Sequence, residues 1–527
     1  MMEAACLRHT EIPHTSKLFS DFQYHFDRVS RFYAYPPGDP NAYAEATKKL
    51  NYPPERRAEL VAALRARNGD SPALELLARP KTVAIVTGQQ VGLFSGPAYS
   101  IYKALTAARI AEQLNEQGIP AVPIFWLATE DHDFAEVNHT YVFDSDHRVV
   151  KLSVNGQQGT ERPVGTIPLT DPPLDRLREA LARFPYGEEV AELVAGSYQP
   201  GVTLGAAFQA LLERLLAGRG LLFIDPLDAS IRRMAAPLLR EALRDGANLH
   251  AKLQDRNREL EAAGYHAQVH VEAKTSLVFL LEGDRRITLR RQNGGYASKD
   301  RSYSTEELMD LAEHLSPNAL LRPVVQDYVL PTVAYVGGPA ELAYMAQSQT
   351  LYEDLLDRMP VMAARSGFTL LDARTAKLMG KFGLTLPNLL HGEDELRARI
   401  AAKLIPSAVT QEFERVQEST TKSLDELIAT LQSFDPTLAA SAAKSRAKIL
   451  YQLSKLQGKT GRETLNRDQR AAADARYMSN LIFPEKHLQE RFYSILPFAA
   501  RYGLGLMDTL YENVRLDCPD HTILAMN

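Results

Sequence analysis

The residues best suited to chemistry form an acidic cluster with one imidazole near position 130. The cluster is Glu130-Asp131-His132-Asp133, and Asn138 follows within two turns. Carboxylates directly after a buried strand are unfavourable unless they are solvated, paired or used. They could bind a substrate amine, accept its proton or hold a magnesium ion, with a solvated helix start as the alternative. We predict no metal site of thiolates or paired histidines.

A glycine-rich stretch at 87–97 is a second candidate ligand-binding element. Its glycines let a ligand approach the backbone, its amides donate and accept, and the following helix would present free N–H groups to an anion. It matches neither a Walker A loop nor the dinucleotide fingerprint, and a turn that only serves helix packing is the alternative. The predicted ligand contacts are Thr87, Gly88, Gln89, Gln90, Gly92, Ser95 and Gly96, with Lys103 or an arginine from elsewhere as counter-charge.

The third candidate stretch, at 335–344, also places glycines at a predicted helix start. Gly337 and Gly338 would admit a ligand, while Glu341 and Tyr344 lie three residues apart and therefore on one helix face. By itself this pattern is equally typical of a packing turn. Together the three stretches favour a binding site more strongly than any one of them.

Each stretch follows a predicted buried strand, which gives the three a common position. We predict strands at 83–86, 122–127, 221–224 and 332–336, and helices at 97–117, with Ser95 as N-cap, and at 340–356. Alternating strands and helices build an open parallel sheet, and ligands bind at the carboxyl ends of its strands. The sequence therefore predicts one site at that edge.

The remaining segments are predicted to surround this α/β core. Residues 1–80 form a helical preface packing on the core, which spans 81–390 with inserts near 140–219 and 265–292, the second antiparallel. Residues 391–480 form a helical hairpin or coiled coil, in which apolar or Thr side chains recur every seven residues at Phe413, Thr420, Leu427 and Phe434. A second run follows at Ala442, Ile449 and Leu456. The apolar stripe of the 391–480 region predicts a homodimer. Residues 481–527 are predicted to return to the core.

Composition excludes several classes of protein. The chain has 527 residues, 45% apolar and 24% charged, with a net charge of −5, which is typical of a globular protein and lacks a nucleic-acid-binding footprint. Its two cysteines, Cys6 and Cys518, lie near opposite ends, so we predict no disulfide framework and a reducing cytoplasm. No signal peptide and no membrane span is predicted.

The three stretches together resemble one known family. The Thr87-Gly88-Gln89-Gln90 loop, the stretch from Phe125 to His139 that contains the acidic cluster, and Gly337-Gly338-Pro339 with Glu341 and Tyr344 resemble the BshC family, the cysteine-adding enzymes of bacillithiol biosynthesis. The resemblance covers nearly the whole chain. It implies an α/β fold with a Rossmann-like core, connecting-peptide-type inserts and an α-helical coiled coil associated with dimer formation. It also implies the joining of L-cysteine to the amine of glucosaminyl malate.

Amide formation from a free carboxylate needs activation, for which ATP, with magnesium possible, is the expected source. The chain lacks both signature motifs of class I aminoacyl-tRNA synthetases, so adenylation and phosphorylation both stay open. An attacking amine must lose its proton, which makes His132 the candidate base and Asp131 its orienting or ammonium-binding partner. The other candidate functions are a non-catalytic sugar- or nucleotide-binding protein that uses its coiled coil as a partner platform, and a sugar-modifying transferase or hydrolase.

Overall fold

The centre of the molecule is a five-stranded parallel sheet. The computed structural model describes residues 4–155, 160–292 and 294–526. In the sheet the strand order is β13-β12-β2-β3-β6, and every neighbouring pair is parallel. The strands are β2 (Val83–Gln90), β3 (Ala121–Ala128), β6 (Leu222–Ile224), β12 (Thr332–Gly337) and β13 (Val361–Ala364). The predicted parallel sheet is confirmed.

Strand β2 is longer than predicted. Thr87, Gly88, Gln89 and Gln90 continue the ladder with β3 to the register pair Gln90↔Ala128. A side chain at Gly88 would meet the Trp126 carbonyl oxygen at 2.8 Å, so the glycine permits close approach of the two strands. The first half of the glycine-rich stretch is therefore strand, and only the remainder is loop.

Both faces of the sheet are buried, as expected for parallel strands. Side chains alternate along β3: Ile124 and Trp126 pack in one apolar cluster, and Phe125 and Leu127 in another. The second cluster includes α5 (Tyr99–Glu116) and α9 (Leu204–Leu215), and the first includes α3 (Pro54–Asn68), α10 (Ala229–Arg244), α11 (Gly246–Ala262), α13 (Arg322–Val329) and α14 (Pro339–Leu356).

Helix α5 begins later than predicted. Its N-cap is Ala98, which makes no side-chain cap, and Ser95 lies in a buried turn with φ 73°. The N–H of Ala98 donates to the carbonyl oxygen of Tyr493 at 2.8 Å. The prediction of Ser95 as N-cap is therefore wrong, because a distant segment satisfies the helix start instead.

Two inserts extend the sheet domain. The first contains a hairpin of β4 (His139–Phe143) and β5 (Val149–Ser153), followed by α7 (Leu174–Leu181), α8 (Gly187–Ala195) and α9. The second is antiparallel, with strand order β10-β9-β8-β7-β11. It continues to residue 317, beyond its predicted end at 292, and comprises β7 (Thr275–Glu282), β8 (Arg285–Gln292), β9 (Gly295–Ala297), β10 (Ser302–Tyr303) and β11 (Leu315–Pro317).

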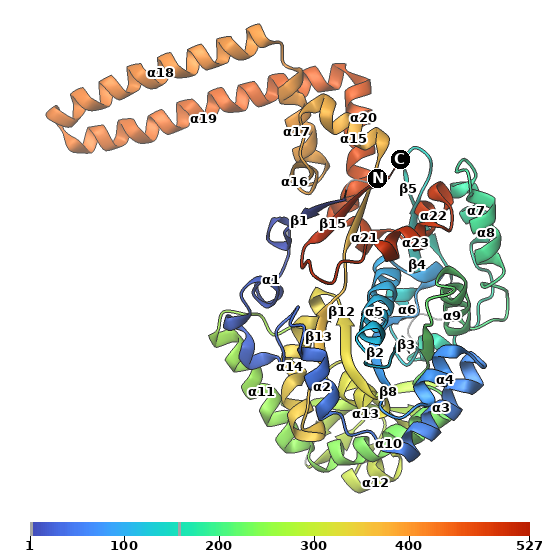
Figure 1. Cartoon of the computed structure of the whole chain (residues 1–527). Coiled ribbons are helices and arrows are strands. Elements are labelled where there is room, and N and C mark those ends of the chain that lie inside the picture. Colours follow the sequence, from blue (N-terminus) through green and yellow to red (C-terminus); the bar gives the residue numbers. More distant parts are fainter. Residues whose placement is uncertain (1–3, 156–159, 293, 527) are drawn as a thin grey trace.

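The two ends of the chain meet in a separate three-stranded sheet. Strand β1 (Ala4–Leu7) pairs antiparallel with β15 (His521–Met526), which pairs in parallel with β14 (Phe368–Asp372). The N and C labels accordingly lie close together in Figure 1. The first 80 residues therefore contain a strand besides the predicted helices α1 (Lys17–Tyr24), α2 (Ala42–Lys49), α3 and α4 (Pro72–Ala78). Short helices α21 (Gln489–Phe492), α22 (Leu496–Tyr502) and α23 (Leu506–Glu512) precede β15.

A long helical hairpin projects from the body (Figure 1). Helices α18 (Ser407–Phe434) and α19 (Pro436–Arg467) pack along each other, flanked by α17 (Glu393–Leu404) and α20 (Gln469–Ile482). Half-buried positions on α18 include Phe413, Thr420, Leu424, Ile428 and Leu431, whereas Leu427 is 49% and Phe434 80% exposed. The predicted seven-residue row is therefore only partly the seam, since a straight helix of 3.6 residues per turn drifts from a strict heptad.

Candidate active site

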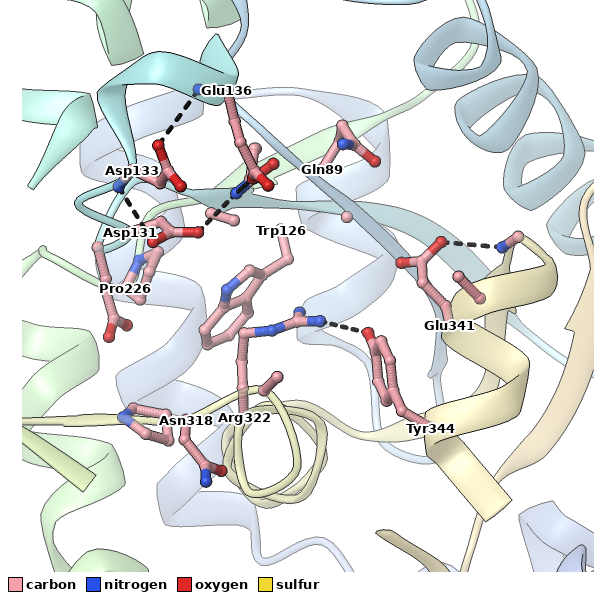
Figure 2. A pocket seen from close by; sticks show the side chains of 18 of the residues that line it. Gln89, Trp126, Asp131, Asp133, Glu136, Pro226, Asn318, Arg322, Glu341 and Tyr344 are labelled. Carbon is pink, nitrogen blue, oxygen red and sulfur yellow. Dashed lines mark hydrogen bonds between the residues drawn. The ribbon is translucent and has the colours of Figure 1, made fainter. Parts of the chain in front are cut away.

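A cavity of about 660 Å³ opens at the carboxyl edge of the parallel sheet. Strand β2 lies between β12 and β3, and the chain leaves it in one direction and later returns on the other side, so this edge includes a topological switch point. The second insert contributes Phe279, Arg286 and Pro317 to the cavity lining, and Asn318 follows directly after it. Figure 2 shows the acidic cluster on one side of the cavity and Glu341 with Tyr344 on the other.

Gln90 joins the glycine-rich stretch to the acidic cluster. Its side-chain amide donates to Asp131 Oδ2 at 2.6 Å and to Glu136 Oε2 at 2.8 Å. Asp133 instead caps α6 (Phe134–Val137) by accepting from the N–H groups of Ala135 and Glu136. The predicted meeting of these two stretches is present, and the carboxylate of Asp133 serves the helix start.

Asp131 is held in its ionised form. Burial acts to raise its pKa, but the hydrogen bond from Gln90, the charge of Arg286 and the N–H groups of His132 and Asp133 outweigh burial and lower the pKa below its ordinary value. The N–H of His132 donates to Asp131 Oδ1 at 2.7 Å. Asp131 is therefore a carboxylate at neutral pH, suited to holding a cation rather than to taking a proton.

Arg286, on β8 of the second insert, connects the other groups of this wall. Its guanidinium donates to Ser316 Oγ and the Pro317 carbonyl oxygen, each at 3.0 Å, and to His132 Nδ1 at 3.2 Å. Arginine has no acceptor, so Nδ1 of His132 is the acceptor and its lone pair is engaged. The neutral ring then carries its proton on Nε2, which leaves His132 no free lone pair for a substrate proton.

The pKa of Glu130 is displaced in the opposite direction to that of Asp131. Burial raises its pKa, although Arg286 and the hydrogen bond from the Ser316 hydroxyl act against the rise. Its side chain lines the cavity. Two adjacent carboxyl groups with pKa values displaced in opposite directions are typical of sites where one group binds charge and the other transfers protons.

On the opposite wall the buried Lys103 forms an ion pair with the half-buried Glu341. Lys103 also donates to the Gly88 carbonyl oxygen at 3.0 Å and to Gln89 Oε1 at 2.8 Å. Glu341 accepts from the N–H of Gly338 at 2.8 Å and from the Tyr335 hydroxyl at 2.7 Å. The charge of Lys103, predicted as the counter-charge of an anion, is thus compensated inside the protein by Glu341 in the first turn of α14.

Arg322 and Arg491 are the cavity cations that remain available. Within the described parts of the chain, neither has a carboxylate partner within 4 Å. Arg322 donates to the Tyr344 hydroxyl at 2.7 Å, and Figure 2 shows its side chain extending between the two walls. Arg365 also lines the cavity but is paired with Glu490, Nη1 to Oε2 at 3.0 Å. An anionic ligand would therefore find its counter-charge at Arg322 and Arg491.

Trp126 supplies an unused donor to the same cavity. Its indole Nε1 is buried and has no hydrogen-bond partner among the residues described. The ring lines the cavity, where Figure 2 labels it near the centre. A buried N–H without a partner is unfavourable unless a ligand or water meets it.

The structure brings together most of the predicted site residues, though not all. Those lining the cavity are Gly88, Gln89, Gln90, Lys103, Glu130, Asp131, His132, Asp133, Gly338, Glu341 and Tyr344. Six others lie outside its lining: Thr87, Gly92, Ser95, Gly96, Asn138 and Gly337. Thr87 donates to the Val336 carbonyl oxygen at 2.9 Å, and Gly92 accepts from the Tyr198 hydroxyl at 3.1 Å, so both serve packing.

The functional candidates missed from the sequence come from distant segments. Arg286, Arg322 and Arg491 carry no local motif, Phe279 belongs to an insert that was not predicted to be part of the main sheet, and Asn318 follows that insert. Trp126 was also missed. Its place four residues before Glu130, near the end of a predicted strand, was the one sequence signal that could have indicated it.

Neither a cluster of metal ligands nor a membrane-spanning helix is found in the described parts of the chain. No group of three or more His, Cys, Asp or Glu side chains within 4–155, 160–292 and 294–526 is arranged to hold a metal ion. No helix in those same ranges combines the length and apolar character needed to cross a bilayer.

Two family models together match nearly the whole chain. The family model described as "Bacillithiol biosynthesis BshC, N-terminal Rossmann-like domain" matches residues 2–366, and "Bacillithiol biosynthesis BshC, C-terminal coiled-coil domain" matches residues 368–526. The predicted fold class is thereby confirmed.

Curated relatives give the same assignment. A protein of Solibacter usitatus is 50% identical over 100% of both chains, and one of Koribacter versatilis 35% identical over 99% of both. A protein of Salinibacter ruber is 33% identical over 97% of this chain and 96% of its own. All three carry the name "Putative cysteine ligase BshC". Because two family models and a relative of 50% identity cover the chain from end to end, it belongs to the BshC family of bacillithiol biosynthesis.

Proposed function

We propose that this protein ligates L-cysteine to the amine of glucosaminyl malate, using a cysteine carboxylate activated by ATP. The observation that carries the proposal is the neighbouring position of Asp131 and Glu130, whose pKa values are displaced in opposite directions, in a cavity lined by two arginines without a carboxylate partner among the described residues. The printed name of the relatives, cysteine ligase, supports the same reaction.

The amine end of glucosaminyl malate is assigned to the acidic wall. The ammonium form would bind the ionised Asp131, and its proton must leave before the nitrogen attacks. Glu130 is the better acceptor, because burial raises the pKa of its carboxyl and the lone pair of His132 Nδ1 is engaged by Arg286. We therefore move the base from His132 to Glu130 and keep His132 as a positioning residue.

The reaction balances with these groups. Glu130 takes one proton from the ammonium, and the neutral amine attacks the activated carbonyl carbon of cysteine. As the amide bond forms and the leaving group departs, the nitrogen gives its second proton to the departing phosphate or to water. The leaving group, AMP or phosphate, departs with the electron pair of the broken C–O bond. The activated carbonyl must lie close to both Glu130 and Asp131 for this attack, which is why a single cavity is required.

The malate end carries carboxylates and needs cations and donors. Arg322 and Arg491, together with the unused N–H of Trp126, meet that requirement. The start of α5 does not, since the N–H of Ala98 is taken by Tyr493 and neither Ser95 nor Gly96 lines the cavity. The predicted anion site at Ser95 is accordingly replaced by the arginine pair.

ATP would supply the leaving group by converting the cysteine carboxylate into an acyl-adenylate or acyl-phosphate. Backbone at Gly338 lines the cavity and would let a nucleotide approach closely. Magnesium would enter with the phosphates, which supply most of its ligands. A cytoplasmic location would provide both ATP and reduced cysteine.

We also propose that the protein acts as a homodimer joined through the α18–α19 hairpin. Leu427, Phe434, Ile449, Tyr451 and Leu456 on the hairpin are between 41% and 80% exposed. A second copy of the same hairpin would cover this apolar surface.

Incubation of the purified protein with L-cysteine, glucosaminyl malate and ATP tests the ligase, with product and nucleotide followed by mass spectrometry. We expect the amide product with stoichiometric AMP or ADP, and the identity of the nucleotide decides the kind of activation. Binding of glucosaminyl malate without any product, and without its accumulation in cells that lack the protein, would favour the non-catalytic binding protein instead.

A further inference from the structure

The only two cysteines of the chain are in contact. Cys6 lies on β1 and Cys518 precedes β15, 512 positions away, yet their sulfur atoms are 3.7 Å apart. A disulfide needs a sulfur separation of about 2.05 Å. Bond formation therefore requires the sulfurs to move about 1.65 Å closer, and Cys6 is exposed while Cys518 is half-buried.

Neighbouring contacts hold the two sulfurs in this position. The β1–β15 ladder pairs Cys6 with Thr522, and the Tyr24 hydroxyl donates to Asp520 at 2.8 Å. Arg515 Nη1 lies 3.7 Å from the Cys6 sulfur. The C-terminal segment that carries Cys518 is therefore fixed against both the edge strand and helix α1.

Cys518 also lines a groove whose residues, apart from Arg365, differ from those that line the active-site cavity. The groove has a volume of about 880 Å³, and its walls include Arg109, Asp517, Arg515 and Arg365. Arg365 also lines the active-site cavity, so the two spaces adjoin at that residue. A small molecule in this groove can thus reach Cys518 without passing through the active-site cavity.

We propose that Cys6 and Cys518 are a reversible redox pair that exchanges with a low-molecular-weight disulfide entering this groove. The Cys518 thiolate attacks one sulfur of the small disulfide, and one small thiolate leaves. The Cys6 thiolate then attacks the Cys518 sulfur, releasing the second small thiolate and forming the internal disulfide. Two protein thiols are oxidised while one small disulfide is reduced to two thiols, so electrons balance.

The order of the two steps follows from the surroundings of Cys6. Burial and the neighbouring Cys518 raise the pKa of the Cys6 thiol, with Arg515 acting in the opposite direction. A thiol with a raised pKa is a poor attacking group in a first encounter. In the second step the target sulfur is already adjacent, which compensates for the low thiolate fraction.

The proposal does not depend on the ligase assignment. Its physical consequence is a bond between the two ends of the chain, which would constrain the unfolded state and raise the melting temperature of the oxidised protein.

Treatment of the full-length protein with 2-hydroxyethyl disulfide at pH 8, followed by intact-mass and peptide analysis, tests the pair. We expect the intact mass to fall by two hydrogens, a linked Cys6–Cys518 peptide, and full recovery with dithiothreitol. Cys6→Ser should stop at a single mixed disulfide on Cys518, while Cys518→Ser should show at least a tenfold slower adduct formation.

Each contrary outcome has a distinct mass because the chain has two cysteines. Two stable mixed disulfides on the wild-type protein, no reaction, or a link between two chains would each overturn the proposal. The wild-type measurement decides this even if a serine variant fails to fold.

Discussion

The Rossmann-like body and the projecting hairpin use their side chains in opposite ways. In the body, the charged side chains of Lys103, Arg365 and Glu490 are buried and paired within the chain. Helix α18 has no buried residue among those described, and Phe434 at its end is 80% exposed. The charges of the body are therefore compensated within the chain, whereas the hairpin leaves apolar side chains exposed, which a second copy would cover in the proposed dimer.

The largest effect in the body is expected from replacing Glu130 and Asp131, the two carboxyl groups whose pKa values are displaced. Glu130→Gln should lower product formation about 100-fold to 10,000-fold, the range a positioned acid or base contributes. Asp131→Asn should also lower product formation, because it removes the charge proposed to bind the ammonium group. Both replacements keep the side-chain shape, so thermal stability should change little. The rate of product formation by mass spectrometry measures the effect.

Exposed residues of the first insert serve as matched controls. Glu192→Gln and Asp171→Asn remove the same charges at exposed positions and should keep wild-type activity. Equal activity of the Glu130 and Glu192 variants would reduce the acidic wall to a solvated helix start.

The Arg365–Glu490 pair compares the stability of the two regions directly. Both side chains are buried, and Glu490→Gln should lower the free energy of unfolding by roughly 3–5 kcal/mol, because it leaves a buried charge without its partner. Glu412→Gln breaks the exposed Glu412–Arg415 pair of α18 and should leave the urea midpoint unchanged. Similar midpoints for both variants would contradict the contrast.

The hairpin is tested by its state of association. Leu427→Glu with Ile449→Glu should convert the proposed dimer to monomers at micromolar concentration, measured by light scattering, without lowering the melting temperature of the body. Gln432→Glu with Gln452→Glu adds the same charge at exposed positions and should keep the dimer. A wild-type protein that is already monomeric would remove the hairpin from the interface.

The smallest expected effect is a pH dependence set by His147 in the body. Burial lowers its pKa to about 4, and its Nε2 accepts from Arg501 Nη1 at 3.0 Å. The unfolded ring has a pKa near about 6.5, so the fold favours the neutral form, and this stability is lost as pH falls from about 6.5 to 4.

The melting temperature of His147→Gln should therefore change less across that range than the wild-type value. His270→Gln is the control, because His270 is 84% exposed in its side chain and should leave the slope unaltered. A wild-type slope in the His147 variant would assign the effect to other groups.

Local patterns were enough to predict the parallel sheet and the edge at which the site lies. Buried β-branched runs followed by glycine turns are determined by neighbouring residues, and the carboxyl ends of parallel strands converge by topology. The junction of Gln90 with Asp131 followed from this, although the strand continued past its predicted end at Val86 because β3 pairs with residues to Gln90.

The sequence by itself determined the kinds of groups at this edge and the elements that carry them, because periodicity and turn chemistry act over a few residues. Only the tertiary structure decided their state: Arg286 from a distant insert engages His132, Glu341 compensates Lys103, and Tyr493 satisfies the start of α5. It also decided that Cys6 and Cys518, which lie near opposite ends of the sequence, are in contact. Charge compensation and contact depend on distance in space, and residues hundreds of positions apart have no shared local pattern that could reveal it.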